Sequence, residues 1–220
     1  MTSSLHRADG QVVVDRYNAP ARANHWLTAI CLILLALSGM SLFHPSLFFL
    51  TGLFGGGQFT RVIHPWFGVV LFFSFAGLFL RFWRANLWEK ADSEWLGKPG
   101  ALLRGDDAKL PEVGRYNAGQ KLVFWGMTLL IVVLFVSGVA IWDRYFFGYS
   151  SIPTKRIAVV AHAAAAVCAI VIWITHVYAA IWVRGTVRAM TRGSVTGGWA
   201  WRHHRKWLRE EVTKGRGGQV

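Results

Sequence analysis

Cysteine and acidic residues are both scarce in this sequence. The two cysteines among 220 residues, Cys31 and Cys168, form no C-x-x-C pair. Iron–sulfur clusters are typically held by about four protein thiolates, so the chain has too few ligands to bind one. Each cysteine lies inside an apolar stretch, and we interpret both as core residues rather than as a disulfide or as metal ligands.

Acidic side chains are outnumbered by basic ones, with 11 Asp and Glu against 24 Lys and Arg and a formal net charge of +13. A basic chain suggests a nucleic-acid partner, but hydrophobic residues make up 54% of this one. The positive charges stand at the ends of long apolar runs and not along a polar helix or sheet. We therefore predict a membrane protein that contacts lipids, with no nucleic acid among its partners.

Four apolar runs are long enough to cross a hydrocarbon core, which takes roughly 20 helical residues. They are His25–Leu42, Val62–Phe82, Leu122–Trp142 and Ile157–Val183. The apolar stretch Pro45–Gly57 is shorter, and we interpret it as re-entrant or interfacial and not as a fifth span. The expected fold is an all-α, four-transmembrane-helix bundle.

Lysine and arginine distinguish the two sides of the membrane. They precede the first span, are absent from Phe43–Thr60, recur throughout Arg84–Arg115, and return in a basic tail at residues 184–220. By the positive-inside rule, both termini are cytoplasmic. No loop is long enough for an independent core, so we predict one membrane domain over residues 1–220.

Four of the eight histidines lie at or inside the predicted spans: His25, His64, His162 and His176. An imidazole in hydrocarbon is costly unless its nitrogens have partners. His162 and His176 are fourteen residues apart on one helix face, or about 21 Å, which is too far for them to share one metal ion. With cytoplasmic termini, His64 and His162 fall in the outer half of the bilayer. His25 and His176 fall in the inner half.

Two histidine pairs stacked across a four-helix bundle are typical of two bis-histidine b haems, in which a neutral imidazole binds each face of the iron. We predict an outer haem between His64 and His162 and an inner haem between His25 and His176. Gly39 is expected beside the outer haem, because small residues let a helix approach the macrocycle. A single core histidine needs no metal, and a zinc or copper site would need three or four ligands at one depth.

The stretch GRYNAGQKLVFW, Gly114–Trp125, opens the third span, and Tyr116–Lys121 within it is the most specific piece of a wider resemblance. Further pieces are ALSGMSLF, HPWFGV, HAAAA, WVRGT and HHRKW. From about Asp15 to about Arg209, the chain resembles the cytochrome b (gamma) subunit of respiratory membrane-bound formate dehydrogenases.

The resemblance implies a multi-pass subunit of the bacterial inner membrane. It implies that a molybdenum or tungsten pterin (alpha) subunit and an iron–sulfur (beta) subunit deliver electrons on the outer side, and that menaquinone or ubiquinone is reduced near the cytoplasmic side. By position, the family's haem ligands fall on the same four histidines in the same two pairs. Its quinone pocket falls on Asn117, Gly119, Gln120 and His176. Asn is also a good helix N-cap, a role that needs no ligand.

The function predicted from these features is that of a di-haem cytochrome b, the electron-transfer and quinone-reducing subunit of a formate dehydrogenase. The chain itself contains no formate-oxidising site. Similar haem pairs would serve the cytochrome b of a nickel–iron hydrogenase or of another molybdoenzyme. A haem-free membrane anchor or transporter, with histidines that relay protons, is a third interpretation. Assembly of the complex into a higher oligomer is left open.

Overall fold

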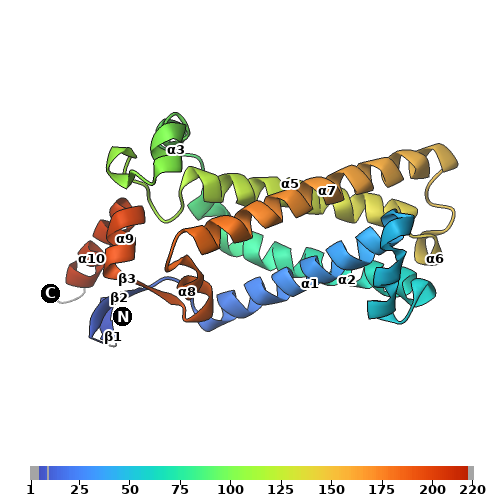
Figure 1. Cartoon of the computed structure of the whole chain (residues 1–220), viewed down its shortest axis with the longest axis horizontal. Coiled ribbons are helices and arrows are strands. Elements are labelled where there is room, and N and C mark those ends of the chain that lie inside the picture. The colour runs from blue at the N-terminus through green and yellow to red at the C-terminus, as the bar shows by residue number, and fades with distance from the viewer. Residues whose placement is uncertain (1–4, 9, 218–220) are drawn as a thin grey trace. The chain divides into compact units, whose positions relative to one another are not determined.

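The computed structural model describes residues 5–8 and 10–217, and most of these residues are helical. The elements follow one another in this order (Figure 1): β1 (Leu5–Ala8), β2 (Gln11–Asp15), α1 (Ala19–Phe43), η1 (Pro45–Phe54), α2 (Gly57–Phe82), η2 (Trp83–Asn86), α3 (Lys90–Leu96), α4 (Pro99–Arg104), η3 (Asp107–Lys109), α5 (Ala118–Ile141), α6 (Asp143–Phe146), α7 (Ile152–Trp182), α8 (Thr186–Thr191), β3 (Ser194–Thr196), α9 (Gly197–His203) and α10 (Arg205–Gly217). The η elements are 3-10 helices.

Four helices in the described residues, α1, α2, α5 and α7, are long and apolar enough to cross a membrane, which confirms the four predicted spans. Each begins four to six residues, or between one and two turns, before the apolar run that predicted it. Polar caps explain two of the earlier starts. Asn18 Oδ1 accepts from the Ala21 amide at 3.1 Å before α1, and Ser151 Oγ accepts from the Thr154 amide at 3.3 Å before α7.

The apolar stretch after α1 forms the 3-10 helix η1 and is too short to be a fifth span. The side chain of His44 accepts a hydrogen bond from the Ser46 amide at its start. Gly55 ends it in the left-handed region, with φ of +81°, where the absence of a Cβ removes the steric cost. The stretch therefore serves as an apolar connection between α1 and α2.

The chain forms two compact units. The span unit consists of Ala23–Arg81 and Trp125–Thr175 and contains most of the four long helices. The polar unit consists of the described parts of Met1–Arg22, Phe82–Phe124 and His176–Val220. It contains the strands, most of the short helices and the first turns of α5.

Neighbouring helices of the span unit meet through a few polar and aromatic contacts. On α1 and α2, the hydroxyls of Thr28 and Ser74 are 2.7 Å apart. On α2 and α5, the rings of Phe72 and Phe135 stack with centroids 4.0 Å apart. The hydroxyl contact satisfies polar groups inside the spans, as a segment in lipid requires, and the ring stack packs α2 against α5.

The polar unit contains a small antiparallel sheet in the order β1-β2-β3. In its register, Val14 of β2 pairs with Val195 of β3, and both are fully buried. The buried cluster around them consists of Val14, Ala189, Val195, Trp199, Ala200 and Trp207. The all-α prediction therefore missed this small sheet, and the single membrane domain over residues 1–220 stays a prediction. The strands have only three to five residues each and come from opposite ends of the chain, so the sequence carries little alternating pattern for them.

Candidate functional site

The imidazoles of His64 on α2 and His162 on α7 lie next to one another in the span unit. Their ring centroids are 6.3 Å apart and their planes are inclined by 67°. They come from helices that the sequence separates by about one hundred residues. The structure thus brings together the two side chains predicted to hold the outer haem.

Ser38 on α1 lies between a backbone carbonyl and His64. Its Oγ is 2.6 Å from the Leu34 carbonyl oxygen and 2.8 Å from His64 Nδ1. Because a carbonyl oxygen only accepts, the single hydroxyl proton goes to Leu34, and Oγ accepts from the His64 Nδ1–H. We therefore assign the Nδ1–H tautomer to His64, which leaves the lone pair on Nε2.

Ser137 on α5 holds His162 in the same way. Its Oγ donates to the Val133 carbonyl at 2.6 Å and lies 2.9 Å from His162 Nδ1. The same reasoning assigns the Nδ1–H tautomer to His162. Both rings therefore carry their free lone pair on Nε2, the nitrogen that can bind a metal.

A glycine follows each of these serines and leaves room for the ring. A Cβ at Gly39 would lie 3.3 Å from His64 Cε1, and a Cβ at Gly138 would lie 3.4 Å from His162 Cε1. Gly39 was predicted to stand at the outer haem, and it lies beside the predicted ligand His64. Gly138 occupies the matching position on α5 and was not singled out from the sequence.

The predicted inner pair, His25 and His176, divides between the span unit and the polar unit and stays a prediction. His25 packs edge-on against Trp26, with ring centroids 5.8 Å apart. His176 lies in the last two turns of α7. No cluster of three or more candidate metal-ligating side chains occurs among the described residues. A pair of axial imidazoles is therefore the arrangement of ligands to consider.

Asn117 and Gln120 cap the start of α5 reciprocally. The Asn117 amide donates to Gln120 Oε1 at 3.0 Å, and the Gln120 amide donates to Asn117 Oδ1 at 3.0 Å. The helix-cap interpretation of Asn117 is thus correct. Because the cap uses both side-chain oxygens, the NH2 groups are what the two side chains can offer to a ligand. These groups are hydrogen-bond donors, as a quinone carbonyl requires.

Gly119, between them, was predicted to let a quinone approach the backbone. In the structure, the Trp95 indole of α3 lies there. A Cβ at position 119 would come 3.4 Å from Trp95 Cη2. The packing of Trp95 is therefore enough to explain a glycine at position 119. The contact of Gly119 with quinone stays a prediction.

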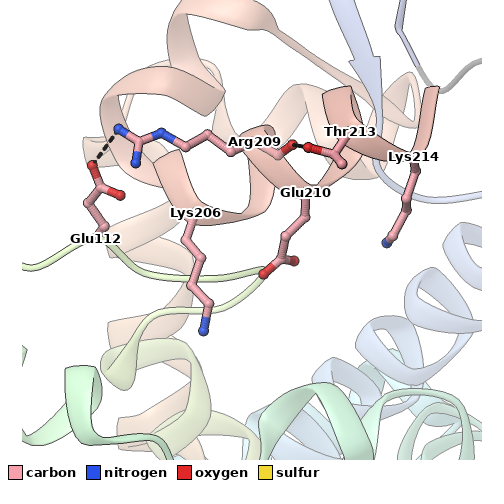
Figure 2. A pocket seen from close by; sticks show the side chains of 6 residues that line it. All are labelled: Glu112, Lys206, Arg209, Glu210, Thr213 and Lys214. Carbon is pink, nitrogen blue, oxygen red and sulfur yellow. Dashed lines mark hydrogen bonds and ion pairs between the residues drawn. The ribbon is translucent and has the colours of Figure 1, made fainter. Parts of the chain in front are cut away.

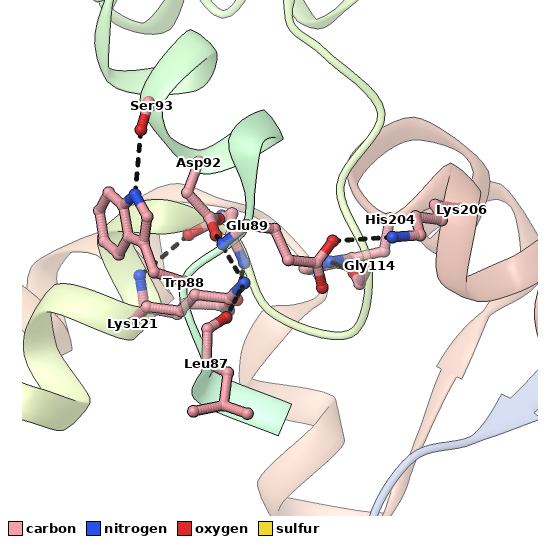
Figure 3. Close-up of polar contacts among 11 residues, drawn as sticks. Leu87, Trp88, Glu89, Asp92, Ser93, Gly114, Lys121, His204 and Lys206 are labelled. Atoms are coloured by element: carbon pink, nitrogen blue, oxygen red, sulfur yellow. Dashed lines mark hydrogen bonds and ion pairs between the residues drawn. The ribbon is translucent and has the colours of Figure 1, made fainter. Parts of the chain in front are cut away.

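Lys121 in the first turn of α5 is buried, with 3% of its side chain exposed, and its Nζ is 2.7 Å from Asp92 Oδ2. Nζ also donates to the Leu87 carbonyl at 2.9 Å. The same Asp92 oxygen accepts from the Glu89 amide at 2.7 Å, and the Glu89 carboxylate pairs with Lys206 of α10, also at 2.7 Å. Figure 3 shows this network, which ties α3, α5 and α10 together.

Arg16 is a second buried cation of the polar unit, with 4% of it exposed. Arg16 and Arg115 each donate to the other's backbone carbonyl. Four rings surround the Arg16 guanidinium at 4.7 to 5.7 Å: Tyr17, Tyr116, Trp199 and Trp207. Cation–π contacts of this kind stabilise a desolvated guanidinium by about 2 kcal/mol or more. Burial raises the pKa of Tyr116, so its hydroxyl stays protonated.

His204 closes the same cluster. It is 1% exposed, and its Nδ1 is 2.8 Å from the Gly114 carbonyl oxygen, to which the Nδ1–H donates. Burial and the nearby Arg16 charge hold the pKa of His204 well below 6.5. His204 is therefore neutral, and it joins the tail to the loop before α5.

An open hollow beside α10 is lined by Glu112, Lys206, Arg209, Glu210, Thr213 and Lys214 (Figure 2). Arg209 pairs with Glu112 at 2.9 Å across it, and both side chains are substantially exposed. None of the residues predicted to bind haem or quinone lines this hollow. It is a solvated charged surface and not the candidate site.

Residues 16–193 match the protein family described as prokaryotic cytochrome b561. The chain belongs to this family. A relative of this cytochrome b, the formate dehydrogenase cytochrome b556(fdo) subunit of Escherichia coli K12, is 45% identical over 197 residues, covering 90% of this chain and 92% of the relative. The nitrate-inducible cytochrome b556(Fdn) subunit of the same strain is 42% identical over 189 residues, covering 86% and 87%. The formate dehydrogenase cytochrome b556 subunit of Haemophilus influenzae is 40% identical over 199 residues, covering 90% and 84%.

These comparisons confirm the resemblance drawn from the sequence. The cytochrome is a multi-pass membrane protein of a family that binds haem b. His64 and His162 fit such a group. An imidazole nitrogen binds a transition metal at about 2 Å, so two imidazoles on opposite faces of one iron have ring centres about 6 Å apart. The observed centroid separation is 6.3 Å, and both Nε2 atoms carry the lone pair.

Sequence reasoning missed the serines of this cytochrome site and the buried pair of Lys121 and Asp92. The signal for the serines was present, because Ser-Gly occurs at Ser38 and again at Ser137, each time in an apolar span. Asp92 lies in an inter-span segment with both acidic and basic residues, so the sequence does not single it out as buried. Its partner, 29 residues away, can be identified only from the folded chain.

Proposed function

We propose that this chain is the membrane cytochrome b subunit of a formate dehydrogenase, and that it carries electrons from a partner subunit to quinone. The family and the three formate dehydrogenase relatives support the first part. The arrangement of His64 and His162 supports electron transfer, and it is the observation that carries the proposal.

His64 and His162 would hold one haem through their Nε2 atoms. A haem supplies reversible one-electron transfer at such a site. Ser38 and Ser137 keep each ring in the tautomer that can bind. The residues thus provide the ligands and their orientation.

A second haem would be held by His25 and His176. The charge distribution supports this assignment, because cytoplasmic termini put both histidines in the inner half of the bilayer. Two haems at different depths would let the chain carry electrons inward across the membrane. The spacing of His162 and His176 along α7 agrees with two separate sites.

Quinone would bind at the start of α5, near the cytoplasmic surface, beside Asn117, Gly119, Gln120 and His176. The reciprocal cap supports this location. It uses only the side-chain oxygens of Asn117 and Gln120, so their NH2 groups can donate to a ligand carbonyl. The quinone would be menaquinone or ubiquinone. Protons for the reduced quinone would come from the cytoplasm.

The partners would be an iron–sulfur subunit on the outer side and, through it, a molybdenum or tungsten pterin subunit that oxidises formate. Two cysteines leave this chain no iron–sulfur cluster of its own, so the electrons must arrive from another subunit. The same haem pair would suit a hydrogenase cytochrome. The identity of 40% to 45% with formate dehydrogenase subunits favours formate as the source of electrons.

The test is an absorption spectrum of the complex purified with this chain from haem-replete cells. Formate should produce the Soret and alpha bands of reduced b haem, and added menaquinone or ubiquinone should remove them. Reduction by hydrogen but not by formate would select the hydrogenase alternative. A preparation with intact subunits and no b-type bands would overturn the cytochrome function itself.

A further inference from the structure

The two histidines of the outer pair are held by two matching arrangements, which we call serine frames. A serine frame consists of a serine, the carbonyl four residues before it and the histidine Nδ1 that it contacts. Ser38 forms one with His64 and Ser137 forms the other with His162, with Oγ to Nδ1 distances of 2.8 and 2.9 Å. In both frames the hydroxyl donates to its carbonyl at 2.6 Å. The frames match although their serines come from α1 and α5.

Each frame fixes which ring nitrogen carries the proton. The serine hydroxyl has one proton, and the carbonyl takes it, so the remaining lone pair of Oγ needs a donor. Only the Nδ1–H tautomer supplies that donor. The other tautomer would set a ring lone pair against the hydroxyl oxygen and would protonate the Nε2 atom that a metal needs.

The same hydrogen bond strengthens the imidazole as a ligand. An Nδ1–H that donates to an oxygen makes the ring more basic and restrains its rotation. A more basic axial ligand stabilises ferric iron relative to ferrous iron, which lowers the midpoint potential of a haem. Two frames on one haem therefore act in the same direction.

From this geometry we infer that Ser38 and Ser137 are positioning residues of the outer haem, which hold its axial histidines in the binding tautomer and lower its midpoint potential. The inference rests on the proposed haem ligation by His64 and His162. It assigns to the serines a role in tuning electron transfer and not only in packing.

A buried serine that bonds its own helix is common in membrane spans, so the test needs such a serine as control. Ser41 is one. It lies on α1, is 2% exposed, and donates to the Ser38 carbonyl at 2.7 Å without reaching a histidine. Ser41→Ala therefore removes a buried hydroxyl from the same helix and leaves both frames intact.

The experiment compares Ser38→Ala, Ser137→Ala, Ser38→Thr and Ser41→Ala in the intact complex. Three measurements are made: haem per chain by pyridine haemochrome, the midpoint potential of each haem by redox titration, and the EPR spectrum of the ferric haems. Ser38→Ala and Ser137→Ala should each raise the midpoint potential of the outer haem and shift the EPR signal of that haem. The midpoint potential of the inner haem should stay unchanged. Ser38→Thr, which keeps the hydroxyl, should restore the wild-type values. The double alanine variant should raise the potential of the outer haem further than either single variant, because the two serines bond different ligands of that haem.

Where an alanine variant loses haem on purification, haemin titration of the depleted complex replaces the redox titration. Affinity at the outer site should then fall roughly 10- to 100-fold, as for other lost partners of a metal-bound histidine. Wild-type potentials and EPR signals in both alanine variants would overturn the inference while leaving haem ligation standing. Shifts of equal size in Ser41→Ala would also overturn it. A wild-type complex without b haem would instead overturn the proposed function.

Discussion

The His64–His162 pair of the span unit and His204 of the polar unit show two uses of one imidazole arrangement. All three donate from Nδ1, to a serine hydroxyl in the span unit and to the Gly114 carbonyl in the polar unit. The rings that lie next to these imidazoles differ. His64 and His162 lie next to one another, whereas the rings of Trp199 and Trp207 pack around His204. The Nδ1 hydrogen bond alone therefore does not identify a ligand, and a second imidazole beside the first is the feature that distinguishes the outer pair.

The two units also differ in how they accommodate buried polar groups. In the span unit, buried hydroxyls such as Ser38 and Ser137 bond to carbonyls of their own helices. In the polar unit, buried charges meet partners from other elements, as Lys121 meets Asp92. A hydroxyl on its own helix is satisfied before helices assemble in lipid, while a charged pair needs the assembled unit. We therefore expect substitutions of the candidate ligands in the span unit to remove haem, and substitutions of the buried charges in the polar unit to lower its stability.

The largest expected effect is loss of one haem in His162→Ala. The variant removes an outer ligand and leaves His25 and His176, so pyridine haemochrome should fall to about half the wild-type haem per chain. His204→Ala is the matched change in the polar unit and should keep full haem content. Unchanged haem in His162→Ala would exclude it as a ligand. Complete loss would show that the bundle needs both haems to fold.

Much of this comparison could be drawn from the sequence, and the reason lies in the spans. Hydropathy identified the four long helices, and charge at their ends gave the depths that paired His64 with His162. The serine frames were missed because a serine in an apolar run looks like an ordinary helix residue until its neighbour on another helix is known. Nothing in the sequence distinguishes His204 from an ordinary solvated histidine of the basic tail. Its burial depends on the packing of β2, β3 and α9 against one another, and these segments are too short for the sequence to predict that packing.

The next largest effect concerns the buried ion pair. Asp92→Asn leaves the Lys121 ammonium buried without its counter-charge, which typically costs about 3–5 kcal/mol of unfolding free energy. Lys206→Gln breaks the exposed pair with Glu89, whose side chains are 47% and 48% exposed, and should cost no more than about 1 kcal/mol. Thermal unfolding in detergent, followed by circular dichroism, measures both. Equal losses in the two variants would contradict the assignment of Lys121 and Asp92 as the pair that holds this unit together.

A smaller effect would separate quinone binding from helix capping. Asn117→Asp and Gln120→Glu keep the oxygens that cap α5 but remove the NH2 donors. If those donors bind a quinone carbonyl, the lost hydrogen bond should slow reoxidation of the formate-reduced haems by roughly five- to a hundredfold. Stopped-flow absorbance measures the rate, and unchanged haem content serves as the control. Reoxidation at the wild-type rate in both variants would leave Asn117 and Gln120 as caps only.

The smallest effect is a pH dependence of the polar unit that arises from His204. Burial lowers the folded pKa of His204 below its ordinary value of 6.5, so below that value the unfolded chain binds a proton that the folded chain does not. Stability of the polar unit should therefore be constant above about pH 7.5 and fall as the pH drops through 6.5, by at most about 1.4 kcal/mol per pH unit. Hydrogen exchange across residues 194–210 follows this locally. His204→Asn keeps a donor for the Gly114 carbonyl and cannot titrate, so its exchange should lose this slope. A slope as steep as that of the wild type would assign the acid sensitivity to other groups.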